Sequence, residues 1–272
     1  MLITHEIAWD KCLSHQIWPA IKKGWKDEDR PIHFFWGLAG KNIAEINECD
    51  RKGEEWWYVD VGYLTEQITR YPEPAIHNYD KTYFRICKGN IHTIRGHVAT
   101  PDRFNILQKQ GIDVEFKGWR DKGDYILLCP SSPTVCKFIN GITQEEWLSR
   151  VQLQLSEITD RPCKIRNKPR PNNEFWGTDI KDDLIGAWCV VTNMSLSAID
   201  GILNMTPAVT HQRNVASFVT SRKLELVEKP FKPGRKTVQE WLNMIANHQF
   251  TLNEIEDGLA YQTLRVQYQL DG

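Results

Sequence analysis

Apolar and polar positions fall into short apolar runs that alternate with amphipathic segments, which is the pattern of an α/β protein. Residues 1–30 are predicted to be helical. The apolar run 32–36 predicts a strand, a glycine turn over 37–40 leads into a predicted helix over 42–51, and residues 56–61 predict another strand. This order of strand, turn, helix and strand indicates parallel strand pairing.

The pattern is looser from residue 64 to 122, where residues 82–87 predict a strand, and it becomes regular again after the charged stretch 121–124. Thr143 followed by Glu146 is the signature of a capped helix start. The second half is predicted to hold strands at 125–129, 163–166, 189–192 and from 206, and helices at 144–158, 181–187, 196–205, 237–246 and 252–259. The sequence therefore predicts two α/β domains, residues 1–122 and residues 123–272.

Residues 187–210 carry the most informative pattern in the chain. A predicted buried strand runs into a polar loop of Thr192, Asn193, Met194 and Ser195, and an amphipathic helix follows. This arrangement directs backbone N–H groups and the positive end of a helix dipole to one point, where phosphate groups bind. Asp200 lies about one helical turn further on, where its carboxylate could accept hydrogen bonds from ribose hydroxyls. We interpret the segment as a nucleotide-sugar site.

A structural explanation competes with this interpretation. Ser197 and Asp200 have the spacing of a capping box, which needs no ligand.

Two other strand ends in the second half supply candidate groups for the same donor. Ser131 and Ser132 offer hydroxyl and N–H groups after the strand at 125–129. Lys164, Arg166 and Lys168 alternate along an extended segment, so they are expected to share one face and to neutralise a diphosphate without a metal. The alternative is a solvated basic edge strand that prevents strand-to-strand aggregation.

The first half supplies candidate groups for an acceptor. Asp60 is expected at the carboxyl end of its strand, where open α/β sheets bind ligands. The expected acceptor-binding residues are Trp36, Gly37, Lys41, Tyr63, Arg85, His92 and Arg103. Tyr83, Arg95 and His97 lie in the same irregular region, and mixed arginine and aromatic side chains suit phosphate and base contacts. The alternatives are a glycine turn that only closes a β–α connection, and basic residues that are simply solvated.

Composition narrows the class of protein. The chain has 272 residues and a net charge of −1, so it is not a generally basic nucleic-acid coat protein. Its eleven tryptophans indicate extensive aromatic packing or a surface that stacks sugars or bases. Its seven cysteines are scattered and form no Cys-x-x-Cys pair, which predicts buried thiols in a reducing compartment and no metal site. With neither a signal-peptide pattern nor a long apolar run, the protein is expected in the cytoplasm.

Common catalytic motifs are absent from the sequence. It has no P-loop, no Gly-x-Gly-x-x-Gly and no Gly-x-Ser-x-Gly. Asp27-Glu-Asp29 matches the metal-binding Asp-x-Asp of one glycosyltransferase class, but it lies in a charged turn and is discounted.

The run from Val190 to Val209 resembles the donor-binding β–α–β unit of GT-B type glycosyltransferases. Asp200 stands where that family usually has a glutamate that contacts ribose, and Met205 replaces the usual glycine before Thr206-Pro207. The chain also resembles, in size and style, the small bacteriophage enzymes that glucosylate hydroxymethylated cytosine in DNA.

The resemblance implies two Rossmann-like α/β lobes with a cleft between them and C-terminal helices. It implies a glycosyltransferase, metal-independent or weakly metal-dependent, that moves a sugar, with UDP-glucose as the expected donor and no other cofactor. The favoured acceptor is a hydroxymethylated or glucosylated base in double-stranded phage DNA, which places the enzyme in the host cytoplasm. Asp60 is the expected general base if the reaction inverts the anomeric centre. The alternatives are a cell-surface glycan as acceptor, or a catalytically inert module that binds nucleic acid or protein.

Overall fold

The computed structural model describes residues 1–5, 13–26, 29–65, 75–93 and 100–268. The chain divides into two compact units: the first unit comprises Met1–Asp113 and Leu242–Gly272, and the second unit comprises Val114–Trp241. This division differs from the expected boundary at residue 122. It also moves the closing helices into the first unit, because they pack on helices and strands formed by the beginning of the chain.

The first unit contains a five-stranded sheet in the order β1-β2-β3-β4-β9. Strands β1 to β3 are parallel, while β4 is antiparallel to both β3 and β9. The strands are β1 (Leu2–His5), β2 (Ile32–Trp36), β3 (Glu55–Val61), β4 (Phe84–Lys88) and β9 (Gln249–Phe250). The helices are α1 (Ser14–Gly24), α2 (Asn42–Lys52), α3 (Asp102–Lys109), α9 (Leu252–Glu256) and α10 (Leu259–Gln267), and α8 (Arg235–Ala246) contains the boundary with the second unit.

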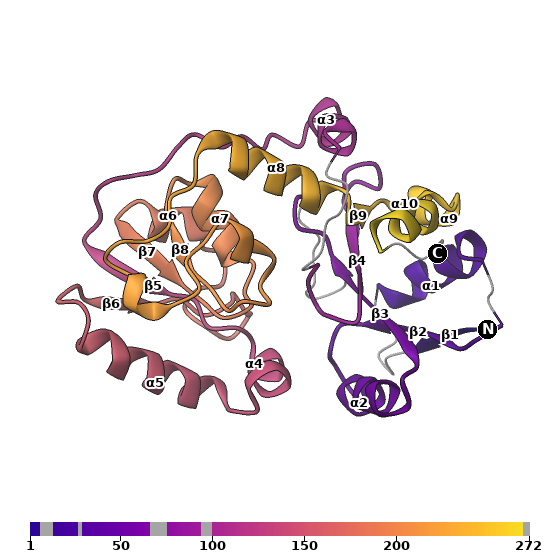
Figure 1. Ribbon diagram of the computed structural model, residues 1–272, viewed down its shortest axis with the longest axis horizontal. Coiled ribbons are helices and arrows are strands. Elements are labelled where there is room, and N and C mark those ends of the chain that lie inside the picture. The colour runs from indigo at the N-terminus through magenta and orange to yellow at the C-terminus, as the bar shows by residue number, and fades with distance from the viewer. Residues whose placement is uncertain (6–12, 27–28, 66–74, 94–99, 269–272) are drawn as a thin grey trace. The chain divides into compact units, whose positions relative to one another are not determined.

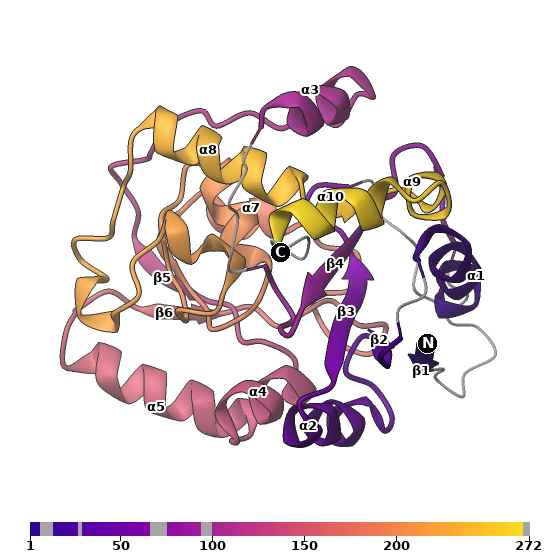
Figure 2. The ribbon, with the colours of Figure 1, turned by 45° about the vertical axis from the view of Figure 1, so that its right-hand side comes forward.

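Alternation along β2 separates the two faces of this sheet. Ile32, Phe34 and Trp36 join a buried cluster with residues of α1, α9 and α10, whereas His33 and Phe35 point to the opposite face. Figures 1 and 2 show α2 on one side of the sheet and α1, α9 and α10 on the other. The predicted β–α–β order of residues 32–61 is therefore confirmed, with parallel pairing of β2 and β3.

The prediction that residues 1–30 are helical is wrong at its start. Leu2–His5 is a strand that pairs in parallel with β2, because the edge of that strand offers backbone hydrogen bonds which outweigh local helix propensity. The helix is confined to α1, and residues 6–12 lie outside the described part of the chain.

Two of the predicted C-terminal helices also differ in detail. Helix α8 begins at Arg235 instead of 237, so Thr237 does not cap it. The predicted helix 252–259 divides into α9 and α10 at Gly258, whose φ of 82° is left-handed. Thr251 starts α9 with a complete capping box to Glu254.

The second unit contains a four-stranded sheet in the order β6-β5-β7-β8, and all of its strand pairs are parallel. Its strands are β5 (Tyr125–Leu128), β6 (Cys163–Ile165), β7 (Ala187–Val191) and β8 (Ala208–Val209). Its helices are α4 (Pro133–Asn140), α5 (Gln144–Ser156), α6 (Ile180–Leu184) and α7 (Ser197–Leu203), with 3₁₀ turns at Val215–Phe218 and Leu224–Leu226. Thr143 caps α5 as predicted, accepting a hydrogen bond from the Glu146 N–H.

The strand order places a topological switch point between β5 and β7. The chain leaves β5 toward β6 on one side, and it leaves β7 toward β8 on the other. Right-handed crossovers therefore put α4 and α5 on one face of the sheet and α6 and α7 on the other, as Figure 1 shows. Ligands of open α/β sheets bind outside the carboxyl ends of the strands at such a point.

Among the described residues, no helix has both the length and the apolar character needed to cross a membrane.

Candidate functional site

The loops after β5 and β7 meet at the switch point of the second unit. The Ser131 hydroxyl donates a hydrogen bond to the side-chain carbonyl of Asn193, and both residues are buried. The Met194 N–H donates to Ser131 Oγ at 3.0 Å and to Asn193 Oδ1 at 2.7 Å. These predicted donor residues therefore lie together, although they come from different strands.

Asn193 also joins the loops to their surroundings. Its amide nitrogen donates to Asn140 Oδ1 at 2.7 Å, at the end of α4. Its backbone carbonyl accepts from the His211 N–H at 3.2 Å and from Asn214 Nδ2 at 3.0 Å. Asn140 and Asn214 were not identified from the sequence, because single asparagines in loops carry no recognisable spacing. The network holds the carboxyl edge of the sheet in one conformation.

The loop N–H groups expected to bind phosphate are already engaged in part. The Ser195 N–H donates to Thr192 Oγ1 at 3.2 Å, and the Ser197 N–H donates to Ser195 Oγ at 3.3 Å. Ser132 is half-buried and caps α4 by accepting from the Val135 N–H at 3.4 Å. The loop is therefore internally braced, and a phosphate role for these groups stays a prediction.

Asp200 does not serve as part of a helix cap. The residue at the N-cap of α7 is Leu196, which makes no side-chain cap, and Ser197 is the first residue of the helix. The capping explanation from the sequence therefore fails. Burial, followed by the charge of Asp179, raises the pKa of Asp200 from 3.8 to about 6, against the opposing charges of Lys181 and Arg166. A carboxyl group with a raised pKa, on the helix that follows the Asn193 loop, is a candidate functional group.

The expected row of cations differs from the prediction in one respect. Lys164 and Arg166 do share one face, as their alternation predicts, but both pair with Asp183 of α6. Arg166 is buried, and its second amino group donates to the Thr178 carbonyl and hydroxyl at 3.1 Å each. Although burial opposes ionisation, hydrogen bonds from both cations lower the pKa of Asp183.

The positive charges of Lys164 and Arg166 are therefore paired with the carboxylate of Asp183. The spacing of residues in the sequence could not reveal this pairing. Lys168 is exposed and lies beyond the end of β6.

In the first unit, Asp60 and Arg85 are direct cross-strand neighbours on β3 and β4. Arg85 Nη2 lies 3.0 Å from Asp60 Oδ2, and the Tyr58 hydroxyl donates to the same oxygen at 2.9 Å. The Val61 N–H donates to Asp60 Oδ1 at 2.8 Å. Three donors on one carboxylate favour its ionised form, which suits an orienting group better than a proton acceptor.

Most other acceptor candidates are buried. Arg103 makes a bidentate pair with Glu254, at 2.8 and 2.9 Å, and donates to the Gln249 carbonyl at 2.8 Å. His92 is buried, with its ring centroid 5.8 Å from that of Tyr63. The alternative that Arg103 and His92 are simply solvated is wrong, because tertiary partners surround both side chains. Arg95 and His97 lie outside the described residues.

The glycine turn after β2 is explained by the backbone. Gly37 has a φ of 61°, and its N–H donates to the Val59 carbonyl at 3.0 Å. Asn42 donates to the carbonyls of Trp36 and Gly37 at 3.0 and 3.1 Å, while Lys41 is exposed. The turn therefore closes a β–α connection, and acceptor binding by Trp36, Gly37 and Lys41 stays a prediction.

A hollow of about 410 Å³ lies in the second unit, beside the Ser221 bridge to β8. It is shallow and largely open to solvent, unlike the enclosed clefts that bury most of a small ligand. The lining residues are Ser217, Phe218, Thr220, Ser221, Arg222, Lys223, Leu226 and Phe231. This hollow is a second candidate place for the nucleoside part of a donor.

The buried thiols are poor candidates for nucleophiles. Burial raises the pKa of Cys87 to about 11 and that of Cys129 to about 12. Thiolates are the reactive form of cysteine, so these groups are inert at neutral pH. The prediction of buried free thiols is confirmed for Cys49, Cys87, Cys129, Cys136 and Cys189, while Cys163 is half-buried and Cys12 lies outside the described residues.

Comparison with known proteins bears on the fold. No protein-family model matches the sequence, and no curated protein matches it either. Among solved structures, the chain is similar to KpsC of Thermosulfurimonas dismutans, a beta Kdo 2,7 transferase, with a TM-score of 0.51. The match has 11% sequence identity and covers 96% of this chain and 99% of that chain. The predicted mixed α/β fold with parallel strands is therefore confirmed.

Proposed function

We propose that this protein is a glycosyltransferase whose nucleotide-sugar donor binds at the carboxyl edge of the β6-β5-β7-β8 sheet. The observation that carries the proposal is the meeting of the Ser131 and Asn193 loops at the switch point between β5 and β7. That is where open α/β sheets bind nucleotides. The likeness to a beta Kdo 2,7 transferase over nearly the whole of both chains supports the reaction class.

Within this proposal, Asp200 contacts the ribose of the donor. It lies on the helix that follows the Asn193 loop, and no capping role accounts for it. Its carboxyl group accepts hydrogen bonds from ribose hydroxyls when ionised, which its pKa of about 6 allows at neutral pH. Lys164 and Arg166 then neutralise the phosphates by exchanging part of their contact with Asp183 for the donor.

Thermal unfolding of the whole chain in the presence of nucleotides tests the donor site. UDP, GDP, CMP and their sugar conjugates are compared, since a ligand at a hundredfold excess over Kd adds about 2.7 kcal/mol to the free energy of unfolding. Asp200→Asn is expected to lower the affinity for whichever nucleotide binds to the wild type. Asp182→Asn, at an exposed position, is the matched control. If Arg222→Ala lowers the nucleotide affinity and Asp200→Asn does not, the nucleoside lies in the hollow beside β8 instead.

The sugar and the acceptor define the finer proposal. Glucose from UDP-glucose and hydroxymethylated or glucosylated DNA remain the specific candidates, with Asp60 orienting or deprotonating the acceptor hydroxyl. The two-lobed GT-B arrangement and its cleft belong to the same proposal. The activity of the similar structure favours the alternative of a glycan acceptor. Incubation with labelled sugar nucleotides and either modified DNA or host glycans distinguishes the two acceptors. Acceptor binding that does not weaken as salt is raised excludes DNA.

One observation favours a second candidate, a catalytically inert binding module. The Lys164 and Arg166 charges are met by Asp183, and the loop N–H groups of Ser195 and Met194 have internal partners. A site braced in this way has less left to offer a diphosphate. If no nucleotide or sugar nucleotide raises the melting temperature, the glycosyltransferase proposal is rejected in favour of this module.

A further inference from the structure

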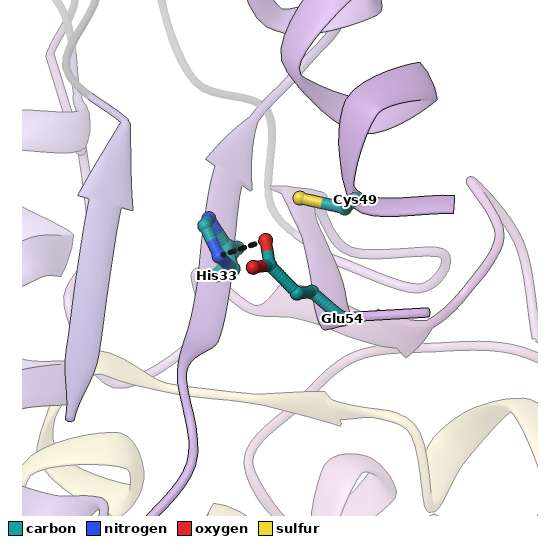
Figure 3. A group of neighbouring side chains, drawn as sticks. All are labelled: His33, Cys49 and Glu54. Atoms are coloured by element: carbon teal, nitrogen blue, oxygen red, sulfur yellow. Dashed lines mark ion pairs between the residues drawn. The ribbon is translucent and has the colours of Figure 1, made fainter. Parts of the chain in front are cut away.

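Three potential metal ligands lie together in the first unit, away from the carboxyl edges discussed above. One ligand atom each from His33, Cys49 and Glu54 lies within 4.8 Å of the others. Figure 3 shows His33 on its strand, Cys49 at the end of a helix and Glu54 directed toward both. His33 and Cys49 are buried, and Glu54 is partly exposed. The absence of a Cys-x-x-Cys pair predicts no metal site, but these three ligands come from separate parts of the chain.

The His33–Glu54 contact has the spacing of two ligands of one ion. His33 Nε2 lies 3.2 Å from Glu54 Oε2, yet this buried nitrogen has no hydrogen-bond partner. The direction of a proton on Nε2 therefore misses the carboxylate. In tetrahedral zinc sites with bonds of about 2.0–2.1 Å, neighbouring nitrogen and oxygen ligands lie about 3.3 Å apart. The separation of His33 Nε2 and Glu54 Oε2 therefore fits two ligands of one metal ion better than a direct hydrogen bond between them.

A helix-ending turn holds Cys49 and Glu54 side by side. Gly53, with a φ of 68°, follows α2, and the Glu54 N–H donates to the Cys49 carbonyl at 2.9 Å. This is the hydrogen bond of a Schellman motif, in which the two residues that it joins usually make a hydrophobic contact. Here a thiol and a carboxylate occupy those positions. Two groups that ionise to anions are favoured in contact when a cation lies between them.

His5 supplies the outer support that a metal-bound histidine normally has. Its Nε2 lies 2.9 Å from His33 Nδ1, and its ring stacks on Phe35 with centroids 4.0 Å apart. An imidazole engaged through Nδ1 has its ring orientation fixed and presents Nε2 to the metal. The support comes from β1, which pairs with β2, so three strands and α2 converge on the cluster.

We propose that His33, Cys49 and Glu54 bind a zinc ion, with a water molecule as the fourth ligand. Nitrogen, thiolate sulfur and carboxylate oxygen together form a ligand set that selects zinc over magnesium or calcium. Closing the cluster requires Cys49 Sγ, which now lies within 4.8 Å of the other two ligand atoms, to approach them to about 3.5 Å. The partial exposure of Glu54 leaves access for the water.

Three protein ligands and a water are the usual set of a catalytic zinc, but the place of this cluster assigns it a structural role. His33 is the second residue of β2, and Glu54 immediately precedes β3, so the ion lies at the amino ends of two parallel strands. Substrates of α/β sheets bind at the opposite ends. Zinc at this position fastens α2 to β2 and β3 and stabilises the unit without entering the reaction. The inference is therefore independent of the proposed glycosyl transfer.

Cobalt substitution of the untagged full chain tests the site directly. Co²⁺ is expected to bind at one equivalent and to give the near-ultraviolet charge-transfer band of a thiolate ligand, and zinc is expected to displace it. Zinc is also expected to raise the melting temperature, and a chelator to reverse the rise. Absence of the thiolate band, or stoichiometric binding without any thermal shift, overturns the proposal.

Variants identify the ligands. Cys49→Ser is expected to abolish the charge-transfer band and to weaken zinc at least tenfold, whereas the half-buried Cys163→Ser leaves both unchanged. His5→Phe keeps the stacking on Phe35 and removes the outer hydrogen bond, so it is expected to weaken zinc about 10- to 100-fold. If Cys49→Ser does not fold, the wild-type cobalt spectrum still decides. Unaltered binding in a folded Cys49→Ser variant contradicts the assignment.

Discussion

The Ser131 hydroxyl donates to the side-chain carbonyl of Asn193, and this bond joins two residues that are 62 positions apart in the sequence. It connects the loops that leave β5 and β7, which are the two strands on either side of the switch point. The same Asn193 side chain accepts from the Met194 N–H and donates to Asn140. One asparagine therefore determines the conformation of the edge where a donor is proposed to bind.

Replacing Asn193 by alanine is expected to destabilise the fold and to abolish nucleotide binding. The change leaves the Ser131 hydroxyl without its acceptor in a buried place, which costs about 1–3 kcal/mol. Urea unfolding measures the loss, and calorimetry with the nucleotide that binds measures affinity. Asn140→Ala removes a single partner of the amide, so it is the milder control. Equal nucleotide affinity in the Asn193→Ala variant would show that the donor lies elsewhere.

The pKa of Asp200 predicts that this carboxyl group makes the protein more stable in mild acid. Its folded-state pKa of about 6 lies above the ordinary 3.8, so between these values the folded state holds a proton that the unfolded state has lost. The free energy of unfolding contributed by Asp200 thus falls as pH rises from about 4 to 6.

Asp200→Asn is expected to be more stable than the wild type at pH 7, by about 1–3 kcal/mol, with the difference vanishing below pH 4. Chemical denaturation at several pH values measures it. A constant difference across the range would refute the titration.

His248 is expected to act in the opposite direction. Burial lowers its folded-state pKa from 6.5 to about 4, so the unfolded state binds the extra proton between these values. Its contribution to stability is therefore lost as pH falls from about 6.5 toward 4. In the wild type, His248 Nδ1 lies 2.9 Å from the Met244 carbonyl oxygen. The glutamine of a His248→Gln variant can still donate a hydrogen bond to that carbonyl. Melting temperatures from pH 4 to 7 should depend less on pH in this variant, and an unchanged profile contradicts the assignment.

Arg103 is expected to stabilise the first unit and not to bind an acceptor. It is only 6% exposed and holds Glu254 with two hydrogen bonds, so Arg103→Ala leaves a half-buried carboxylate with only its hydrogen bond from the Thr251 N–H. The expected loss is about 3–5 kcal/mol of unfolding free energy. A double-mutant cycle with Glu254→Gln isolates the pair in urea unfolding. Normal stability together with lost acceptor binding would restore the acceptor role.

Local patterns predicted much of the second unit. The strand, loop and helix from Ala187 to Leu203 could be anticipated because apolar runs and polar turns are properties of neighbouring residues. The nearness of Ser131 to Asn193 followed from parallel pairing, since carboxyl ends of parallel strands share one edge. The pairing of Arg166 with Asp183 could not be anticipated, because it depends on the side of the sheet on which α6 packs.

In the first unit, the sequence was less informative because decisive partners are distant in the chain. Arg103 and Glu254 are separated by 151 positions, and no local pattern relates them. The His33, Cys49 and Glu54 cluster depends on the turn at Gly53 and on the register of β2 with β3. A search for closely spaced cysteine pairs could not find it. One sequence signal could have revealed the cluster. It is a helix-ending glycine followed by a carboxylate, with a cysteine four residues before that glycine.

The division of the chain also has a consequence for biosynthesis. The second unit is one continuous segment, whereas the first unit is assembled from two segments that this continuous segment separates. Strand β9 completes the first sheet, and α9 packs on α1, so residues 1–113 cannot complete their fold until the segment from Leu242 has been synthesised. Nascent chains halted before Leu242 should hold a protease-resistant middle segment while the amino-terminal strands remain open to chaperones.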